Sequence, residues 1–306
     1  MLQAQTIWKL ATGYRTESFH TTNIKQFAKD VELATTGTLR IEVHPNNELF
    51  KLDAIRQAVQ DGKVQAGETI MSSMVRDIPI AGADSIPFVV SSYERARRMW
   101  DLQRPLIDKH FLQRGLKVLY AVPWPPQGLY AGAPVRSSAD FKGTRMRTYN
   151  QSTIRIAEML GATPVDVPMA EVSKALASGQ IDNMITSSVT GVENQVWSQI
   201  KHYYEINAWF PKNIVFVNLK AFDELDRSVQ QKMLKAAAEA EGRGWAMSQD
   251  LATRSTNELK SRGMKVDRIP ADFEAALKRM GETFSREWVR SVGSEANHIF
   301  VPYYQN

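Results

Sequence analysis

The chain alternates between stretches with the hydrophobic period of a helix and stretches with that of a strand. Residues 6–12 predict a strand, and the helix after them has one apolar face: Ile24, Phe27, Ala28 and Val31. In the next predicted strand every second residue is apolar: Leu39, Ile41 and Val43. Residues 55–62 predict a helix that ends at Gly62, and residues 63–70 predict another strand. Helices and strands in this order predict an α/β fold.

The same alternation returns between Gly143 and Asp182. The pattern predicts strands at residues 144–148, at residues 163–167 and from Ile181 onward. The first helix between them ends at Gly161, and its predicted core-facing residues are Ile154, Ala157 and Leu160. The second helix ends at Gly179, and its predicted core-facing residues are Val172, Ala175 and Leu176. This run places Arg147 on a short strand.

The two halves share a weak internal repeat. Residues 58–65 and residues 175–182 both combine a helix end, a glycine and a strand start. A two-lobed binding protein is expected to show such a repeat, and short chance matches between α/β segments look the same.

The last third of the chain predicts a long helix. A strand at residues 213–219 precedes a helical stretch over residues 226–262, which Gly242 and Gly244 weaken in its middle. A helix of that length runs about 50 Å, longer than one lobe, so we expect it to lie across both lobes. A short strand at residues 264–266 follows, and a last amphipathic helix carries Phe273, Leu277, Met280, Phe284 and Trp288.

The length of 306 residues exceeds that of one ordinary domain, and no Gly-, Pro- or Ser-rich linker separates independent parts. We therefore expect two lobes, each a mixed sheet flanked by helices. Lobe one is predicted to hold residues 1–122 and 212–250, and lobe two residues 123–211 and 251–306. Hinge strands and the long helix join them.

Arg147 is the most informative candidate for a binding residue. The planar guanidinium of arginine binds a carboxylate through two parallel hydrogen bonds. An arginine at the end of a strand, beside the start of a helix, is well placed to hold a small organic acid. A surface ion pair gives the same local pattern.

Several motifs, in order, resemble the extracytoplasmic solute receptors of TRAP transporters, the DctP family. Residues 142–147 read Lys-Gly-x-x-x-Arg, residues 161–165 read Gly-Ala-x-Pro-Val, and residues 171–182 read Glu-Val-x-x-Ala-Leu-x-x-Gly-x-x-Asp. Earlier in the chain, residues 36–45 read Thr-Gly-x-Leu-x-Ile-x-Val-x-Pro, and Asp-Gly at 61–62 and Ile-Pro-Phe-Val-Val at 86–90 also fit. The resemblance covers essentially the whole chain.

The resemblance implies a periplasmic-binding-protein fold of two lobes that close like a Venus flytrap on a ligand. It also implies a periplasmic receptor that docks, loaded, on separate membrane subunits of a transporter. No signal peptide is visible at Met1, so on this interpretation the leader has been removed. The net charge of +5 favours anionic ligands. No nucleic-acid signature is present, so we expect no nucleic-acid partner.

The family's carboxylate-binding arginine corresponds to Arg147. A second arginine of several relatives falls on Gln127, which puts dicarboxylates and sialic acids in doubt, although Gln127 can still hydrogen-bond a keto or hydroxyl oxygen. Thr186 replaces the asparagine usual in the family. Glu68 aligns with a pocket glutamate and is expected to accept a hydroxyl proton, its alternative role being a solvated or ion-paired carboxylate. Tyr14, with Arg15, is a candidate contact from the first lobe.

Apolar residues flank these positions, and each of them is also compatible with ordinary core or hinge packing. They are Trp124, Met169, Trp209 and Phe210. Together with one charged clamp they favour a keto or hydroxy monocarboxylate with an apolar or aromatic tail.

Motifs for catalysis and for cofactors are missing from the sequence. The five histidines are scattered, there is no cysteine, and neither a dinucleotide loop, a phosphate loop nor a nucleophile elbow occurs. We therefore expect no enzyme, no cofactor and no metal. A C4-dicarboxylate receptor, a sensing receptor with the same pocket, and an enzyme on the same fold remain the alternatives.

Overall fold

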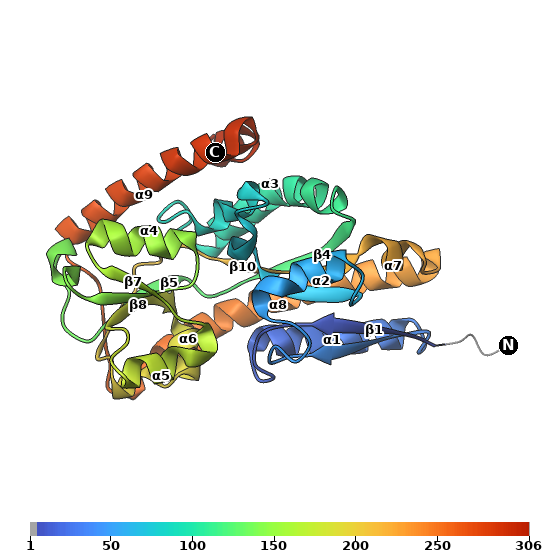
Figure 1. Cartoon of the computed structure of the whole chain (residues 1–306), viewed down its shortest axis with the longest axis horizontal. Helices are drawn as coiled ribbons and strands as arrows, with labels where there is room; N and C mark the ends of the chain where they lie inside the picture. Colours follow the sequence, from blue (N-terminus) through green and yellow to red (C-terminus); the bar gives the residue numbers. More distant parts are fainter. Residues whose placement is uncertain (1–4, 306) are drawn as a thin grey trace. The chain divides into compact units, whose positions relative to one another are not determined.

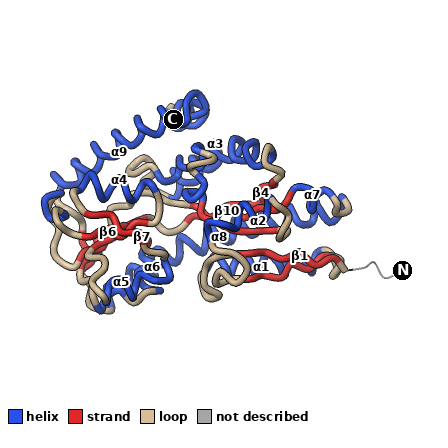
Figure 2. Tube along the Cα trace, in the orientation of Figure 1, coloured by secondary structure: helices blue, strands red, loops and turns tan. Residues whose placement is uncertain are grey.

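A computed structural model describes residues 5–305 of the chain, which divide into two compact units. Unit 1 holds the described residues up to Ala81 together with Gln103–Pro123 and Lys212–Ser248. Unit 2 holds Gly82–Leu102, Trp124–Pro211 and the described residues from Gln249 onward. Each unit contains one mixed sheet with helices packed on it, as the sequence predicted (Figures 1 and 2).

Unit 1 is built on a five-stranded sheet in the order β2-β1-β3-β10-β4. The strands are β1 (Thr6–Ala11), β2 (Leu39–His44), β3 (Ala66–Ile70), β4 (Leu116–Pro123) and β10 (Lys212–Asn218). β1 runs parallel to β2 and β3, whereas β10 is antiparallel to β3 and β4. The helices wholly within this unit are α1 (Phe19–Ala34), α2 (Ile55–Gln60) and α7 (Leu219–Asp223).

The helices of unit 1 pack on the sheet through the positions that the sequence predicted. In α1 the predicted face is buried: Ile24, Phe27, Ala28 and Val31. In α2 both Ile55 and Val59 are buried. Gly67 on β3 permits this approach, because a Cβ there would meet Ile55 Cγ2 at 2.5 Å. The predicted strand at residues 63–70 starts later than expected, at Ala66.

Unit 2 is built on a six-stranded sheet in the order β11-β9-β5-β8-β6-β7. The strands are β5 (Gln127–Ala131), β6 (Arg145–Thr148), β7 (Thr163–Asp166), β8 (Asn183–Ser187), β9 (His202–Tyr204) and β11 (Lys265–Asp267). The helices are α4 (Gln151–Leu160), α5 (Val172–Ala177), α6 (Ser188–Glu193), α9 (Ala271–Val292) and α10 (Asn297–Tyr304). Figure 1 shows α4 on one side of these strands and α5 and α6 on the other.

The helix α4 begins with an Asn150 capping box and ends at Gly161, whose φ of 78° is the left-handed geometry that favours glycine. Its inward face differs from the prediction by one position. Ile156 is buried and Ile154 is only half-buried, because both lie near the edge of the apolar stripe and the packing selects one. The third strand begins at Asn183 and not at Ile181, although Ile181 is buried in the core of the unit.

Two helices contribute residues to both units, namely α3 (Tyr93–Leu112) and α8 (Arg227–Ser261). The predicted long helix is therefore present and unbroken. The helix α8 runs through Gly242 and Gly244 without a break, and Gly244 has a packing role. A Cβ at Gly244 would lie 2.4 Å from Val122 Cγ2 and 2.7 Å from Asn23 Nδ2, so the glycine lets α8 approach β4 and α1 closely.

The compact units differ from the predicted lobes mainly in residues 82–102, which group with unit 2. Two hydrogen bonds hold this segment there: Phe88 N donates to Ala208 O at 2.6 Å, and Tyr303 Oη donates to Val89 O at 3.0 Å. The movement of two lobes about a hinge stays a prediction.

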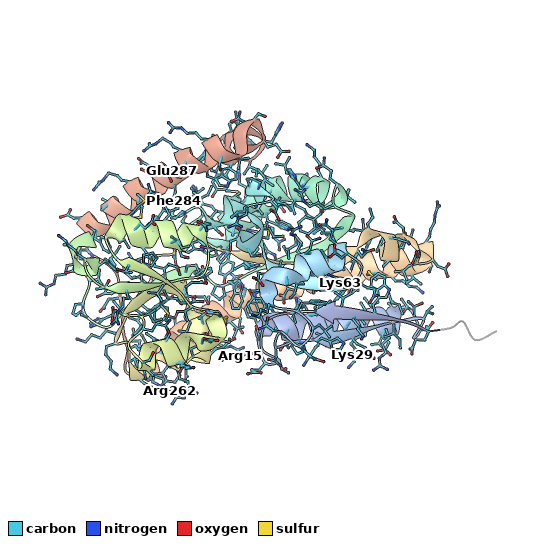
Figure 3. All side chains as sticks on the ribbon, viewed as in Figure 1. Arg15, Lys29, Lys63, Arg262, Phe284 and Glu287 are labelled. Carbon is cyan, nitrogen blue, oxygen red and sulfur yellow. The ribbon has the colours of Figure 1, made fainter. Side chains whose placement is uncertain are left out.

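Charged side chains extend from the surface of both units, among them Lys29, Lys63, Arg262 and Glu287 (Figure 3). Within residues 5–305 no helix is both long and apolar enough to cross a membrane.

Candidate functional site

Arg147 is a buried cation in unit 2. It lies on β6, between β7 and β8, and its residue is 3% exposed. Its Nε donates to the carbonyl oxygen of Val167 at 2.9 Å. The guanidinium carbon lies 4.9 Å from the ring centroid of Tyr149. These contacts restrict the orientation of the guanidinium, and its role as a carboxylate clamp stays a prediction.

Tyr149 connects Arg147 to Gln127. The phenol hydroxyl donates to Gln127 Oε1 at 3.1 Å. The residue is partly exposed, yet its hydroxyl is densely surrounded, and this burial raises the pKa of Tyr149 to about 12 although the charge of Arg147 and the indole of Trp209 act to lower it. The tyrosine is therefore neutral at physiological pH. Its O–H donates a hydrogen bond, and the residue carries no negative charge that would repel an anion.

Gln127 is buried at the start of β5, and both ends of its side-chain amide have partners. Oε1 accepts from Tyr149, and Nε2 donates to Pro125 O at 3.0 Å. Its backbone binds the segment before β10, because Gln127 N donates to Trp209 O at 3.0 Å and Ala208 N donates to Gln127 O at 2.9 Å. The fold thus brings together three of the predicted site residues: Arg147, Gln127 and Trp209.

The other predicted residues of unit 2 lie in the same sheet or beside it. Trp124 is buried, and its N–H donates to Pro211 O at 2.8 Å. Phe210 is buried against Tyr93, with ring centroids 5.0 Å apart. Thr186 is buried on β8, where it pairs with Gly128 of β5. Met169 is half-buried in the short turn of helix after Pro168. Their contact with a ligand stays a prediction.

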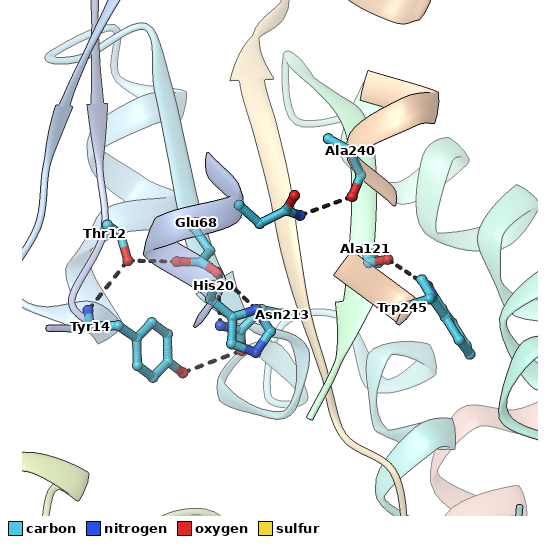
Figure 4. Close-up of polar contacts among 9 residues, drawn as sticks. Thr12, Tyr14, His20, Glu68, Ala121, Asn213, Ala240 and Trp245 are labelled. Carbon is cyan, nitrogen blue, oxygen red and sulfur yellow. Dashed lines mark hydrogen bonds and ion pairs between the residues drawn. The ribbon is translucent and has the colours of Figure 1, made fainter. Parts of the chain in front are cut away.

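Unit 1 buries a carboxylate, that of Glu68 on β3, inside a network of polar side chains (Figure 4). Thr12 Oγ1 donates to Glu68 Oε2 at 2.6 Å, and Asn213 Nδ2 donates to Glu68 Oε1 at 2.9 Å. His20 Nδ1 lies 3.5 Å from the same Oε1. The network joins β1, α1, β3 and β10, so Glu68 is not the solvated carboxylate that was one alternative.

The surroundings of Glu68 disfavour its charge. Burial raises the pKa of Glu68 to about 7, although the hydrogen bonds from Thr12 and Asn213 act to lower it. Burial also lowers the pKa of His20 well below its ordinary value, so the imidazole is neutral and supplies no counter-charge.

Tyr14, the other candidate from the first half, belongs to this network. Its hydroxyl donates to Asn213 Oδ1 at 3.3 Å, and its N–H donates to Thr12 Oγ1 at 3.3 Å. Its neighbour Arg15 is partly exposed.

Sequence reasoning missed Tyr149 in unit 2 and Thr12, His20 and Asn213 in unit 1. A signal for Tyr149 was present, because an aromatic two residues after Arg147 in an extended segment lies on the same side of the chain. For Asn213 there was none, since it lies 145 residues from Glu68.

Among residues 5–305, no three histidine, aspartate or glutamate side chains gather in a way that could hold a metal ion.

Comparisons with known proteins agree over nearly the whole chain. The model of the family described as bacterial extracellular solute-binding protein, family 7, matches residues 11–291. The structure of DctP6, a Bordetella pertussis extracytoplasmic solute receptor binding pyroglutamic acid, has a TM-score of 0.96 at 35% identity, covering 98% of this chain and 100% of that one.

Two further relatives extend this result. A TRAP solute-binding protein from a marine metagenome, specific for pyroglutamate, has a TM-score of 0.95 at 35% identity and 99% coverage of both chains. The C4-dicarboxylate-binding periplasmic protein DctP of Rhodobacter capsulatus is 25% identical over 299 residues, covering 89% of this chain and 84% of that protein. The chain therefore belongs to the family-7 bacterial extracellular solute-binding proteins, the DctP family, whose members include the extracytoplasmic receptors of TRAP transporters.

Proposed function

We propose that this protein is a periplasmic receptor that captures a small monocarboxylate with the size and chemistry of pyroglutamate and delivers it to the membrane subunits of a TRAP transporter. The observation that carries the proposal is the buried, oriented guanidinium of Arg147 in a chain that is 35% identical to a receptor of pyroglutamic acid.

Arg147 supplies the charge for this task. A guanidinium that is already oriented by Val167 O and by the ring of Tyr149 loses little side-chain freedom when it binds a carboxylate. Micromolar affinity corresponds to about 8 kcal/mol, which one desolvated carboxylate pair and the burial of a small apolar ring can supply.

Gln127 supports a ligand with one carboxylate rather than two. It is a neutral residue where a second arginine would hold a second carboxylate, and its hydrogen bonds to Tyr149 and Pro125 fix its amide. A side-chain amide has two N–H donors, of which Pro125 O uses one, so the other can bond a ligand oxygen, but the neutral amide supplies no counter-charge for a second carboxylate.

Contacts from unit 1 remain part of the proposal. Glu68 and Tyr14 are its candidates, with the carboxyl of Glu68 as an acceptor for a hydroxyl or N–H of the ligand. A carboxylate offers about four acceptor positions, so the bonds from Thr12 and Asn213 do not exhaust it.

A thermal-shift and calorimetric screen tests the ligand class. The acids are L-pyroglutamate, keto and hydroxy monocarboxylates with and without aromatic tails, and four-carbon dicarboxylates. A ligand at 100 times its Kd stabilises the fold by about 2.7 kcal/mol, which is a clear shift. We expect pyroglutamate to bind most tightly. Selective binding of dicarboxylates would contradict the proposal and reveal a second cationic contact.

Delivery is tested separately, with vesicles that hold paired TRAP membrane subunits from the same source. We expect uptake of the labelled acid only when the loaded receptor is added. Tight binding without stimulated uptake would favour the sensing receptor, and chemical conversion of the acid would favour the enzyme.

A further inference from the structure

The last two helices of unit 2, α9 and α10, enclose an open groove of about 310 Å³. The helix α9 contributes a serine, a valine and two arginines to its lining, and α10 contributes two aromatic residues: Ser285, Arg286, Val289, Arg290, Phe300 and Tyr304. None of these side chains is among the candidate ligand contacts. The groove is therefore a surface feature that the proposed capture of a small acid does not use.

Aromatic side chains form the apolar part of the groove. The ring of Phe300 lies 5.2 Å from that of Trp288 and 5.8 Å from that of Tyr304, measured between centroids. Phe300 is half-buried, whereas the residue of Tyr304 is 61% exposed. Tyrosine and arginine around an apolar centre are residue types that commonly carry the binding energy between two proteins.

The helix α10 is held in place from its other side. Ile299 and Tyr303, one turn apart, are buried. Tyr303 Oη donates to Val89 O at 3.0 Å, and the guanidinium of Arg98 donates to Pro302 O. These contacts anchor α10 to the helix α3 and to the segment before it. The groove is thus preformed, so ordering this wall costs a binding partner little free energy.

Two cations flank the apolar part of the groove. Arg286 and Arg290 lie one turn apart on α9, and both are exposed. Within the described part of the chain neither guanidinium forms an ion pair, and that of Arg286 donates to Thr283 Oγ1 at 3.3 Å. The neighbouring acid Glu287 is paired with Arg155 of α4 at 3.2 Å. Like charges one turn apart destabilise a helix, so local helix stability does not account for the two arginines.

The charge of this surface discriminates between classes of partner. Glu282, one turn before Arg286, is a single acid against two arginines, so the surface is positive on balance. A second copy of this chain in a symmetric contact would bring the same arginines together, and its net charge of +5 adds to the repulsion.

A bilayer fits the shape of the surface less well than a protein segment does. Anionic lipids attract arginines too, but a helix that lies on a bilayer buries an apolar face in it, whereas here apolar side chains line a groove. A protein segment that carries carboxylates around an apolar side chain complements both the charge and the concave shape.

We propose that the α9–α10 groove is a docking surface for an acidic segment of a membrane subunit of the transporter. An apolar side chain of that segment enters between Val289, Phe300 and Tyr304. Its carboxylates pair with Arg286 and Arg290. The identity of the partner rests on the proposed function, because a receptor that delivers its ligand must contact the membrane subunits.

Reversing the two charges tests the surface. The groove variant carries Arg286→Glu and Arg290→Glu, and the matched control carries the same changes at two exposed arginines of unit 1, Arg76→Glu and Arg227→Glu. Each receptor is loaded with the acid that binds most tightly in the screen above. Surface plasmon resonance measures docking on nanodiscs of uncharged lipid that hold the paired membrane subunits from the same source. We expect the groove variant to dock about tenfold or more weakly, and the control like the wild type.

A second variant tests the apolar part without changing the charge. Tyr304→Ala removes an exposed ring and keeps both arginines, and we expect it to dock about fivefold more weakly. Added salt should weaken docking of the wild type more than docking of the groove variant. Calorimetry should give all variants the same affinity for the loaded acid, and circular dichroism checks that each fold is kept.

Each other outcome has a defined meaning. Docking that survives both the charge reversal and Tyr304→Ala would overturn the inference and leave the proposed function standing. A wild type that does not dock on the nanodiscs would contradict the proposed delivery, and the inference with it. Empty vesicles of anionic phosphatidylglycerol are the lipid control. An equal loss of binding by the groove variant on these vesicles would assign the surface to the bilayer and contradict docking on a protein.

Discussion

Glu68 in unit 1 and Arg147 in unit 2 are both ionisable residues buried on strands, but the surroundings of Glu68 disfavour its charge whereas those of Arg147 favour it. Glu68 lies among neutral partners, namely Thr12, Asn213 and an uncharged His20, and its pKa rises to about 7. Arg147 lies against a carbonyl oxygen and an aromatic face, both of which attract a cation.

This difference indicates separate tasks. A guanidinium stays charged at any physiological pH, so under the proposed function Arg147 offers an anionic ligand a permanent cation. The pKa of Glu68 lies near neutrality, so under the proposed function it is an acceptor whose charge depends on pH.

Removing the permanent cation should have the largest effect. We expect Arg147→Ala to weaken binding of the cognate acid about 1,000-fold, or about 4 kcal/mol, because the carboxylate loses its only assigned counter-charge. Calorimetry measures the affinity, and circular dichroism checks that the fold is kept. Affinity within tenfold of the wild type would show that the clamp lies elsewhere.

Neutralising the buried acid should change how stability depends on pH. The folded pKa of Glu68, about 7, lies above the ordinary value of 4.5. The unfolded chain therefore loses its proton first, and the contribution of Glu68 to stability is full below pH 4.5 and declines up to pH 7 by about 3 kcal/mol. Glu68→Gln removes this decline.

Urea unfolding at several pH values measures this effect. We expect Glu68→Gln to gain stability relative to the wild type as the pH rises from 5 to 8. Four other ionisable groups influence the region from neighbouring elements, namely His20 on α1, Tyr120 on β4, and Arg243 and Glu241 on α8, and all four are retained in the variant. Parallel stability curves would show that Glu68 titrates normally.

A smaller effect is expected at the link between Arg147 and Gln127. Tyr149→Phe keeps the ring under the guanidinium but removes the hydrogen bond to Gln127 Oε1. We expect about fivefold weaker binding, or about 1 kcal/mol, by calorimetry. Tyr149→Leu, which also removes the ring, should cost more. If both variants bind equally well, the ring does not orient Arg147.

The smallest effect is expected at Arg145, two residues before Arg147 on β6. Its guanidinium pairs with Asp182 through two hydrogen bonds, at 2.9 and 2.7 Å, but both side chains are well exposed. Exposed pairs contribute little, so Arg145→Ala should leave ligand affinity unchanged and stability nearly so. This variant is the matched control for Arg147→Ala, and a large loss of binding in it would mean that the strand, not the charge of Arg147, is what matters.

The helices and strands that the sequence predicted well are those with local signals. Gly62 and Gly179 follow helices at equivalent places of the weak repeat, and both adopt positive φ, 70° and 69°. The residue after each glycine donates to the helix in the same way, to Ala58 O and Ala175 O. The helix–glycine–strand unit was readable because its hydrogen bonds join residues a few positions apart.

Gly244 shows where local reasoning fails. Glycine in a helix lowers its stability, so the sequence indicated a weak point in α8. The structure instead uses the missing Cβ to bring α8 against Val122 and Asn23, which are more than a hundred residues away in the chain. Propensity describes an isolated helix, whereas packing decides which residue a surface can accommodate.

By itself the sequence determined the α/β class, the long helix, the family and the candidate arginine, because periodicity, glycine stops and ordered motifs are properties of short segments. Only the tertiary structure decided that Arg147 is buried against Tyr149, that Tyr149 bonds to Gln127, and that Glu68 shares its carboxylate with Thr12 and Asn213. Apart from the neighbours Arg147 and Tyr149, these groups come from segments far apart in the chain. Their burial, which raises the pKa of Glu68 and of Tyr149, exists only once the sheets have formed.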